Sequence, residues 1–325
     1  MRILSGVRPS GELHIGNYLG AVRNWVELQA KEECICFVAD LQALTTPYST
    51  KELQRHILDT VTAYLAAGID PEKSVIFVQS HVKEHNELFW LLSTICPVGD
   101  LSRMTQYKEK SRQFKNNVNA GLLNYPVLQA ADILLYKADL VPVGKDQLQH
   151  LELTRTIARK FNQRFGKVFV EPEAYSPKIG TKIMSLQNPK KKMSKSDDQR
   201  GCIGLFEEPE SIKEKIMAAT TDSGKEIKYD SVKKPGISNL LSIYSLFSDQ
   251  EIKEIERKFK GKNYADLKKS LAELLIDSLK EFRRRKKELA TRQVYIEDIL
   301  AKGARRAQII AQSTMEEVRK KMGLI

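Results

Sequence analysis

The sequence contains no apolar run approaching the roughly 18 to 20 residues of a membrane-spanning helix. It also has no charged leader followed by an apolar stretch and a cleavage site, so we expect a cytoplasmic protein with no membrane association. Its 4 cysteines include no Cys-x-x-Cys pair, and Cys34 and Cys36 sit in an apolar run, where cysteine behaves as a small buried side chain. These absences predict no disulfide and no structural metal site.

At 325 residues and 42% hydrophobic composition, the chain can bury one large core together with that of a smaller attached domain. Its 53 lysines and arginines against 41 aspartates and glutamates leave a formal net charge of +12. The excess gathers at residues 190–195 and 283–287, which favours a large anionic partner. The alternative for residues 283–287 is a solvated helix face.

The first motif is a turn between a short apolar strand at residues 2–4 and a helix. Gly6 to Gly11 is too rich in glycine, proline and serine to continue the strand. The first turn of the helix carries His14, Gly16 and Asn17 at an N-terminus whose unpaired N–H groups attract anions. We expect this turn to bind a nucleotide phosphate. A plain strand-to-helix turn is the alternative that the motif alone leaves open.

The second motif is the lysine-rich segment from Pro189 to Ser196. It holds 4 lysines between positions 190 and 195, and such charges repel one another unless an anion lies among them. This pattern favours a mobile loop that becomes ordered around a polyphosphate. A solvated basic loop is the alternative.

Strands and helices alternate through the first half of the chain. Near-continuous apolar runs predict strands at 34–39, 75–78 and 140–143, and a helix spans 51–67. This pattern is typical of an α/β fold with a parallel, Rossmann-like sheet. Open sheets of this kind bind ligands at the carboxyl ends of their strands, so Gly6 to Gly11 and Gly144 to Gln147 should face one pocket.

The later residues have helical spacing, at 212–219, 237–247, 251–259 and about 265–301. We therefore predict a smaller all-helical domain beside the Rossmann-like catalytic domain. The expected boundaries are a catalytic domain over 1–188 with a helical insertion at about 88–137, a mobile loop over 189–196, a helical domain over 197–302, and a C-terminal helix over 303–325 that follows Gly303.

One carboxylate is set among apolar residues. Asp132 lies in the predicted helix from Leu122 to Leu135 with apolar neighbours on nearly every side. A buried aspartate needs a hydrogen-bond donor, which is either another group of the protein or an N–H of a ligand. The sequence leaves both possibilities open.

Taken together, these motifs resemble those of class I aminoacyl-tRNA synthetases, and more closely those of the tryptophanyl-tRNA synthetase family. The resemblance covers nearly the whole chain. It rests on residues 6–20, 131–134, 143–150, 183–186, 192–196 and 235–241. It implies a tryptophan–tRNA ligase that forms tryptophanyl-adenylate and pyrophosphate from tryptophan and ATP, then transfers tryptophan to the 3′-terminal ribose of tRNA(Trp). The substrate carboxylate is already a nucleophile, so the protein must hold the reactants in line and stabilise phosphate charge.

The same resemblance implies roles for individual residues. Catalysis is expected from His14, Asn17, Lys192 and Lys195. Contacts to ATP are expected from Arg8, Pro9, Ser10, Gly16, Asn17, Gly144, Lys145, Asp146, Ile183, Lys192, Met193, Ser194, Lys195 and Ser196. Contacts to tryptophan are expected from Leu4, Tyr125, Gln129, Asp132, Ile133, Val141, Val143 and Gln147. Core packing is the alternative for the apolar members of both sets, and helix capping is the alternative for Asp146.

The resemblance also implies partners. Mg²⁺ is expected to arrive with ATP, the far end of the helical domain to bind the anticodon, and a homodimer to form through residues 100–114. Leu4, Arg8, Gln42 and Gln129 depart from the residues usual in well-known bacterial members. Tyrosine is the rival substrate, because tyrosyl enzymes also use a helical aspartate and Gln129 mimics the glutamine that accompanies it in some of them.

The sequence also leaves open two functions of other classes. His81, Glu84 and His85 match the H-x-x-E-H pattern of a zinc peptidase, although no third ligand is evident. A non-catalytic RNA-binding relative of synthetases is the second, but such a protein has no need of Lys192 and Lys195, and both are present.

Overall fold

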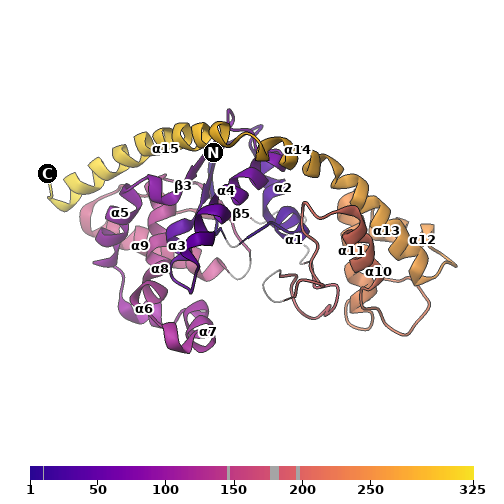
Figure 1. Ribbon diagram of the computed structural model, residues 1–325. Helices are drawn as coiled ribbons and strands as arrows, with labels where there is room; N and C mark the ends of the chain where they lie inside the picture. Colours follow the sequence, from indigo (N-terminus) through magenta and orange to yellow (C-terminus); the bar gives the residue numbers. More distant parts are fainter. Residues whose placement is uncertain (10, 145–146, 176–182, 195–197) are drawn as a thin grey trace. The chain divides into compact units, whose positions relative to one another are not determined.

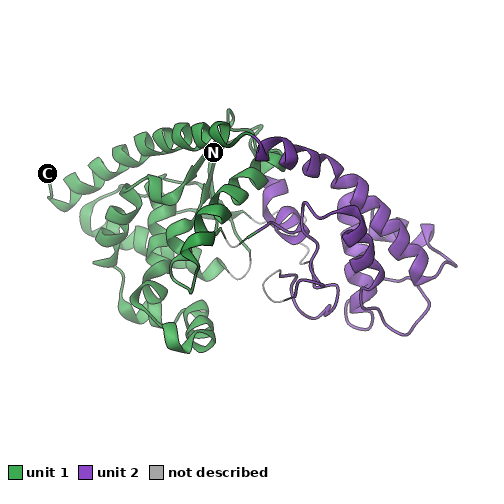
Figure 2. Cartoon of the chain, in the orientation of Figure 1, with its two compact units in different colours: residues 1–11, 25–178, 292–325 green, residues 12–24, 179–291 purple. Residues whose placement is uncertain are grey.

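The computed structural model describes residues 1–9, 11–144, 147–175, 183–194 and 198–325. These residues form two compact units, shown in separate colours in Figure 2. The first unit comprises residues 1–11, 25–178 and 292–325, and the second comprises residues 12–24 and 179–291. The chain therefore passes between the units more than once, and each unit is described by itself.

The first unit is built on a five-stranded parallel sheet with the strand order β3-β2-β1-β4-β5. Its strands are β1 (Arg2–Val7), β2 (Glu33–Val38), β3 (Ser74–Val78), β4 (Leu140–Pro142) and β5 (Glu173–Tyr175). The predicted parallel α/β sheet is confirmed. Strand β5 was not predicted, because a three-residue edge strand with partly exposed side chains leaves no apolar run in the sequence.

Helices cover both faces of this sheet. The helices of the first unit are α2 (Arg23–Leu28, which begins in the second unit), α3 (Asp40–Ala43), α4 (Thr50–Ala66), α5 (Glu84–Ser93), α6 (Val98–Ser102), α7 (Thr105–Gln113), α8 (Ala120–Leu135), α9 (Leu148–Phe165) and α15 (Gln293–Met322), with short 3₁₀ turns at Gln79–His81 and Lys115–Asn117. Leu4, Ile35 and Phe77 bury one face in a core shared with α5, α8 and α9. Elsewhere in this unit Trp25 packs edge-on against Tyr64 of α4, with the ring centroids 5.5 Å apart. The central strands β2 and β3 are largely apolar and buried because helices cover both faces of the sheet there.

The C-terminal helix differs from its prediction. Gly303 was expected to precede a separate last helix, yet α15 runs through it from Gln293 to Met322 and lies along β3 and α5 (Figure 1). A Cβ atom at Gly303 would lie 1.8 Å from the carbonyl oxygen of Ile76. This glycine therefore allows close packing of helix against strand rather than ending the helix.

The second unit is helical, as expected for the later part of the chain. It contains α1 (Ile15–Asn17), the π-helical turn η1 (Tyr18–Val22), α10 (Pro209–Met217), α11 (Pro235–Ser248), α12 (Ile252–Lys258), α13 (Tyr264–Ser278) and α14 (Lys280–Ala290). The helical stretch expected over about 265–301 is divided into α13, α14 and the start of α15, and the non-helical backbone of Arg292 separates α14 from α15. Among the described residues, no helix has the length and apolar character needed to cross a bilayer.

The packing of Gly303 predicts that Gly303→Ala lowers the free energy of unfolding by about 2 kcal/mol or more, because the new methyl group meets backbone rather than a movable side chain. Urea unfolding measures this change. The matched control is Gly99→Ala in α6, where the nearest atom is the flexible end of Arg103 at 3.7 Å. A loss of equal size in both variants would contradict the packing explanation.

Candidate active site

The first unit contains a pocket of about 380 Å³ at the carboxyl ends of β1, β2 and β4. The expected convergence of the segments after β1 and β4 is confirmed for the described residues, because Gly6, Arg8, Gly144 and Gln147 all line this pocket. All eight residues predicted to contact tryptophan line it as well: Leu4, Tyr125, Gln129, Asp132, Ile133, Val141, Val143 and Gln147.

Several lining residues were absent from the predicted site. Phe37 lies near the carboxyl end of β2, Ala39 follows that strand, and Gln42 lies on α3. Their position at the end of a buried parallel strand is the sequence signal that could have identified them. Lys110 reaches the pocket from α7, and nothing in the sequence separated it from the other lysines of that helix.

Asp132 lies on α8, and its residue is 2% exposed. Its carboxylate is within hydrogen-bond distance of Gln42, Gln79 and His85. The donor that a buried aspartate requires is thus supplied by the protein, which was one of the two possibilities left open. The same residue also lines the pocket, so a donor of the ligand can reach it as well.

The H-x-x-E-H segment does not form a metal-binding pair. His81 is exposed in the turn before α5, whereas His85 is fully buried. Nδ1 of His85 lies 2.7 Å from Asp132, and Nε2 lies 2.8 Å from the hydroxyl of Tyr136. Both ring nitrogens are therefore engaged within the protein, which leaves His85 no nitrogen for a metal.

Two cations lie close to the ring of one tyrosine at the pocket wall. The guanidinium carbon of Arg8 lies 5.4 Å from the ring centroid of Tyr125, and Nζ of Lys110 lies 4.8 Å from it. The hydroxyl of Tyr125 lies 2.8 Å from Nε2 of His150, which fixes the ring. Burial and the charge of Arg8 lower the pKa of Lys110 to about 8, and burial also lowers the pKa of Arg8. Two close cations disfavour each other, so an anion between them would stabilise both.

In the second unit, His14 and Asn17 cap their own helix. Nδ1 of His14 accepts the backbone N–H of Asn17 at 3.3 Å, and Oδ1 of Asn17 accepts the N–H of His14 at 3.1 Å. Backbone bonds from Ile15 to Ile203 and from Leu205 to Leu13 hold this turn in place. A Cβ atom on Gly16 would contact Ile183 at 3.7 Å. The turn thus lies against the segment that leads into the lysine-rich motif.

That segment is a short hairpin. The backbone of Ile183 pairs with Met193, and Met184 forms an antiparallel bridge with Lys192. Asn239 of α11 binds both backbone groups of Met184 at 2.9 Å, which anchors the hairpin to the helical core. Ser185 donates to Asp198 at 2.6 Å, closing the base of the loop. Met193 is buried, and Lys192 is exposed.

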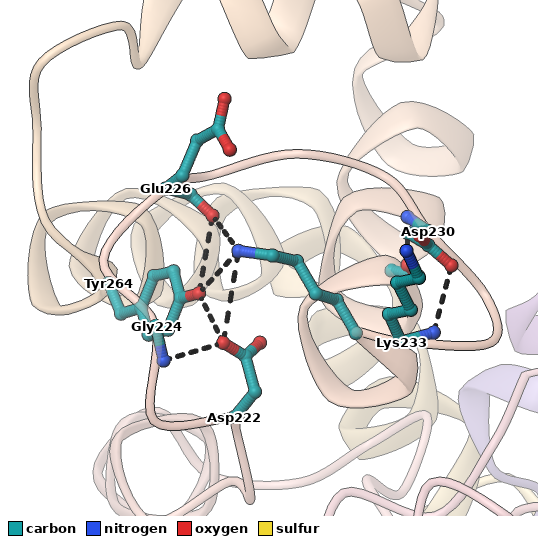
Figure 3. A network of polar contacts seen from close by, with 8 residues as sticks. Asp222, Gly224, Glu226, Asp230, Lys233 and Tyr264 are labelled. Carbon is teal, nitrogen blue, oxygen red and sulfur yellow. Dashed lines mark hydrogen bonds and ion pairs between the residues drawn. The ribbon is translucent and has the colours of Figure 1, made fainter.

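A polar network fixes the chain just before α11 (Figure 3). Oδ1 of Asp222 accepts the N–H of Gly224 at 2.8 Å and the hydroxyl of Tyr264 at 2.7 Å. Nζ of Lys234 donates to the carbonyl of Glu226 at 2.8 Å and lies 3.8 Å from Asp222. Partial burial disfavours the charged carboxylate of Asp222, but these hydrogen bonds and Lys234 outweigh it and lower its pKa. The network positions the helix that supplies Asn239.

The predicted site residues fall in both units. Those in the second unit are His14, Gly16, Asn17, Ile183, Lys192, Met193 and Ser194. Arg8, Pro9 and Gly144 lie in the first unit with the pocket. Five predicted residues lie outside the described residues: Ser10, Lys145, Asp146, Lys195 and Ser196.

A parallel sheet with a pocket at the carboxyl ends of β1 and β4, where the strand order reverses, is typical of α/β proteins that bind ligands at the switch point of the sheet. The model of a family described as tRNA synthetases class I (W and Y) matches residues 1–280. The chain belongs to this family.

Individual relatives agree with this assignment. A protein of Caldanaerobacter subterraneus subsp. tengcongensis named tryptophan–tRNA ligase is 53% identical over 325 residues, which is 100% of this chain and 98% of the relative. A tryptophanyl-tRNA synthetase of Mycoplasma pneumoniae superposes with a TM-score of 0.91 at 36% identity over 99% of this chain and 97% of its own. A Campylobacter jejuni tryptophanyl-tRNA synthetase, complexed with ADP and tryptophan, has a TM-score of 0.86 at 38% identity over 99% of this chain and 100% of its own.

The lowered pKa of Lys110 predicts a pH dependence of stability. Between about pH 8 and the ordinary lysine value of 10.5, the unfolded chain holds a proton that the folded chain has released. The stability of the wild type relative to Lys110→Met should therefore rise with pH across this window. Urea unfolding from pH 7 to 10 measures the difference, with Lys108→Met on the same helix as the control. If the difference in unfolding free energy between the wild type and Lys110→Met does not change with pH, the lowered pKa of Lys110 is contradicted.

Proposed function

We propose that this chain is a tryptophan–tRNA ligase, which forms tryptophanyl-adenylate from tryptophan and ATP and then transfers tryptophan to the 3′-terminal ribose of tRNA(Trp). Membership of the family and the names of relatives at high identity over the full chain support this function. The structural observation that carries it is the buried carboxylate of Asp132 in a pocket whose lining combines apolar side chains, glutamine amides and the two cations Arg8 and Lys110.

The pocket suits an amino acid with an aromatic donor. Apolar side chains from β4 and α8, such as Val141 and Ile133, provide walls for a flat ring. The carboxylate of Asp132 accepts a hydrogen bond, and the indole N–H is a donor only. Phenylalanine would leave this acceptor unpaired, at a cost that excludes it strongly. Tyrosine also carries a donor, so the preference for tryptophan rests on the relatives and on the shape of the pocket.

The cations serve the first chemical step. Attack of the tryptophan carboxylate on the α-phosphate brings two anions together, so positive groups must offset their repulsion. Arg8 and Lys110 supply that charge at the pocket wall, and we propose the same role for Lys192. His14, Gly16 and Asn17 offer a helix N-terminus to the triphosphate. Mg²⁺ enters with ATP in this proposal.

The proposal extends to partners and location. The net charge of +12 suits tRNA, whose binding should weaken with salt. Trp90 of α5 and Val98 of α6 are each 67% exposed, and Val98 directly precedes the expected dimer segment 100–114, which supports a homodimer. All four cysteines are buried thiols, which agrees with a cytoplasmic location.

Substrate choice is tested by pyrophosphate exchange into ATP, run separately with tryptophan, tyrosine and phenylalanine. We expect exchange with tryptophan alone in the wild type. Asp132→Ala should lower kcat/KM for tryptophan about 100-fold and reduce the discrimination against phenylalanine, because the acceptor is gone. Strong tyrosine-dependent exchange in the wild type would overturn the proposed specificity.

The role of Lys192, in the hairpin formed by residues 183–184 and 192–193, is tested separately. Lys192→Ala should lower kcat for exchange about 100-fold, the usual cost of losing one group that stabilises transition-state charge. Lys190→Ala, an exposed lysine two positions earlier, is the matched control and should remain within about threefold of wild type. Equal losses in both variants would show a general effect of loop charge rather than a contact by Lys192.

A further inference from the structure

Hydrogen-bond donors of the protein occupy most of the acceptor positions of the Asp132 carboxylate. Its Oδ1 accepts from Nε2 of Gln79 at 2.6 Å and lies 2.7 Å from Nδ1 of His85. Its Oδ2 accepts a longer bond, of 3.2 Å, from Nε2 of Gln42. Each carboxylate oxygen accepts about two hydrogen bonds. Counting the described residues, Oδ1 is saturated and Oδ2 retains one acceptor position.

The two oxygens also face different surroundings. Asp132 and Gln42 line the pocket, whereas Gln79 and His85 are 0% exposed and lie outside its lining. The saturated oxygen is therefore held from behind the pocket wall. The remaining acceptor position is on Oδ2, whose donor Gln42 lines the pocket.

The imidazole of His85 is itself held in one orientation and one tautomer. Nε2 lies 2.8 Å from the hydroxyl of Tyr136, and the imidazole packs against Phe37 and Phe77 with centroids 6.0 and 5.9 Å away. The carboxylate of Asp132 accepts hydrogen bonds, so the proton of a neutral imidazole lies on Nδ1 and the Tyr136 hydroxyl donates to Nε2. Burial, with Asp132 and Glu84 nearby, raises the pKa of Tyr136, so its hydroxyl keeps this proton.

We propose that His85 and Tyr136 are positioning residues for substrate selection. His85 fixes Oδ1 of Asp132 so that Oδ2 presents a single acceptor to the indole N–H, and Tyr136 fixes the tautomer of His85. This inference rests on the proposed tryptophan specificity. Neither side chain lines the pocket, so both act through Asp132.

The arrangement has a consequence for ligands that lack the N–H. Such a ligand leaves Oδ2 short of a donor, and the cost is largest when the carboxylate cannot turn toward another one. Removing His85 frees the carboxylate to rotate. Discrimination against the analogue should then weaken more than activity toward tryptophan itself.

The probe is 3-benzothienylalanine, in which sulfur replaces the indole N–H. The experiment measures kcat/KM for pyrophosphate exchange with tryptophan and with this analogue, and takes their ratio. His85→Leu should lower the ratio about 10-fold, and Tyr136→Phe about threefold. His85→Asn should stay within about twofold of wild type, because its amide N–H replaces Nδ1–H on the same carbon.

The matched control is Tyr64→Phe, which deletes the hydroxyl of another fully buried tyrosine, one that neither lines the pocket nor bonds to Asp132. Its ratio should equal that of the wild type. Equal losses for both amino acids in His85→Leu and Tyr136→Phe, with the ratio unchanged, would show that the two residues act only on folding and would overturn the inference. If His85→Leu does not fold, Tyr136→Phe decides the outcome. A wild type with no tryptophan-dependent exchange would instead refute the proposed function.

Discussion

A single buried carboxylate constrains the pocket. Asp132 can remain inside the first unit because Gln42, Gln79 and His85 supply donors to it, and an unpartnered carboxylate there would be costly. The same donors restrict what the carboxylate can still accept. Stability and selection thus use the same hydrogen bonds, since the groups that make burial of Asp132 tolerable also decide which ligand donor fits.

The fold places this carboxylate where chemistry can reach it. Parallel strands bring the ends of β1, β2 and β4 to one edge, and α8 carries Asp132 beneath that edge. Close packing of α15 through Gly303 covers β3. In the second unit a different principle operates, because the first helical turn and the lysine hairpin are held together by backbone bonds and by Asn239 rather than by a sheet.

The sequence predicted the parallel sheet because its strands are buried on both faces and therefore have continuous apolar runs. The eight residues that the resemblance assigns to tryptophan all line one pocket, whereas Phe37, Ala39, Gln42 and Lys110 line it without having been predicted. Local patterns failed where tertiary packing decides: Gly303 has the signature of a helix end, yet it serves close contact with Ile76. Lys110 and the partners of His85 depend on contacts between distant segments, which no spacing along the chain encodes.

The most direct measurement is a crystal structure of the protein with tryptophan bound in the pocket. The account predicts the indole nitrogen about 2.7 to 3.2 Å from Oδ2 of Asp132, with Gln79 and His85 still bound to Oδ1. An indole nitrogen paired with Oδ1, or with a group other than Asp132, would contradict it.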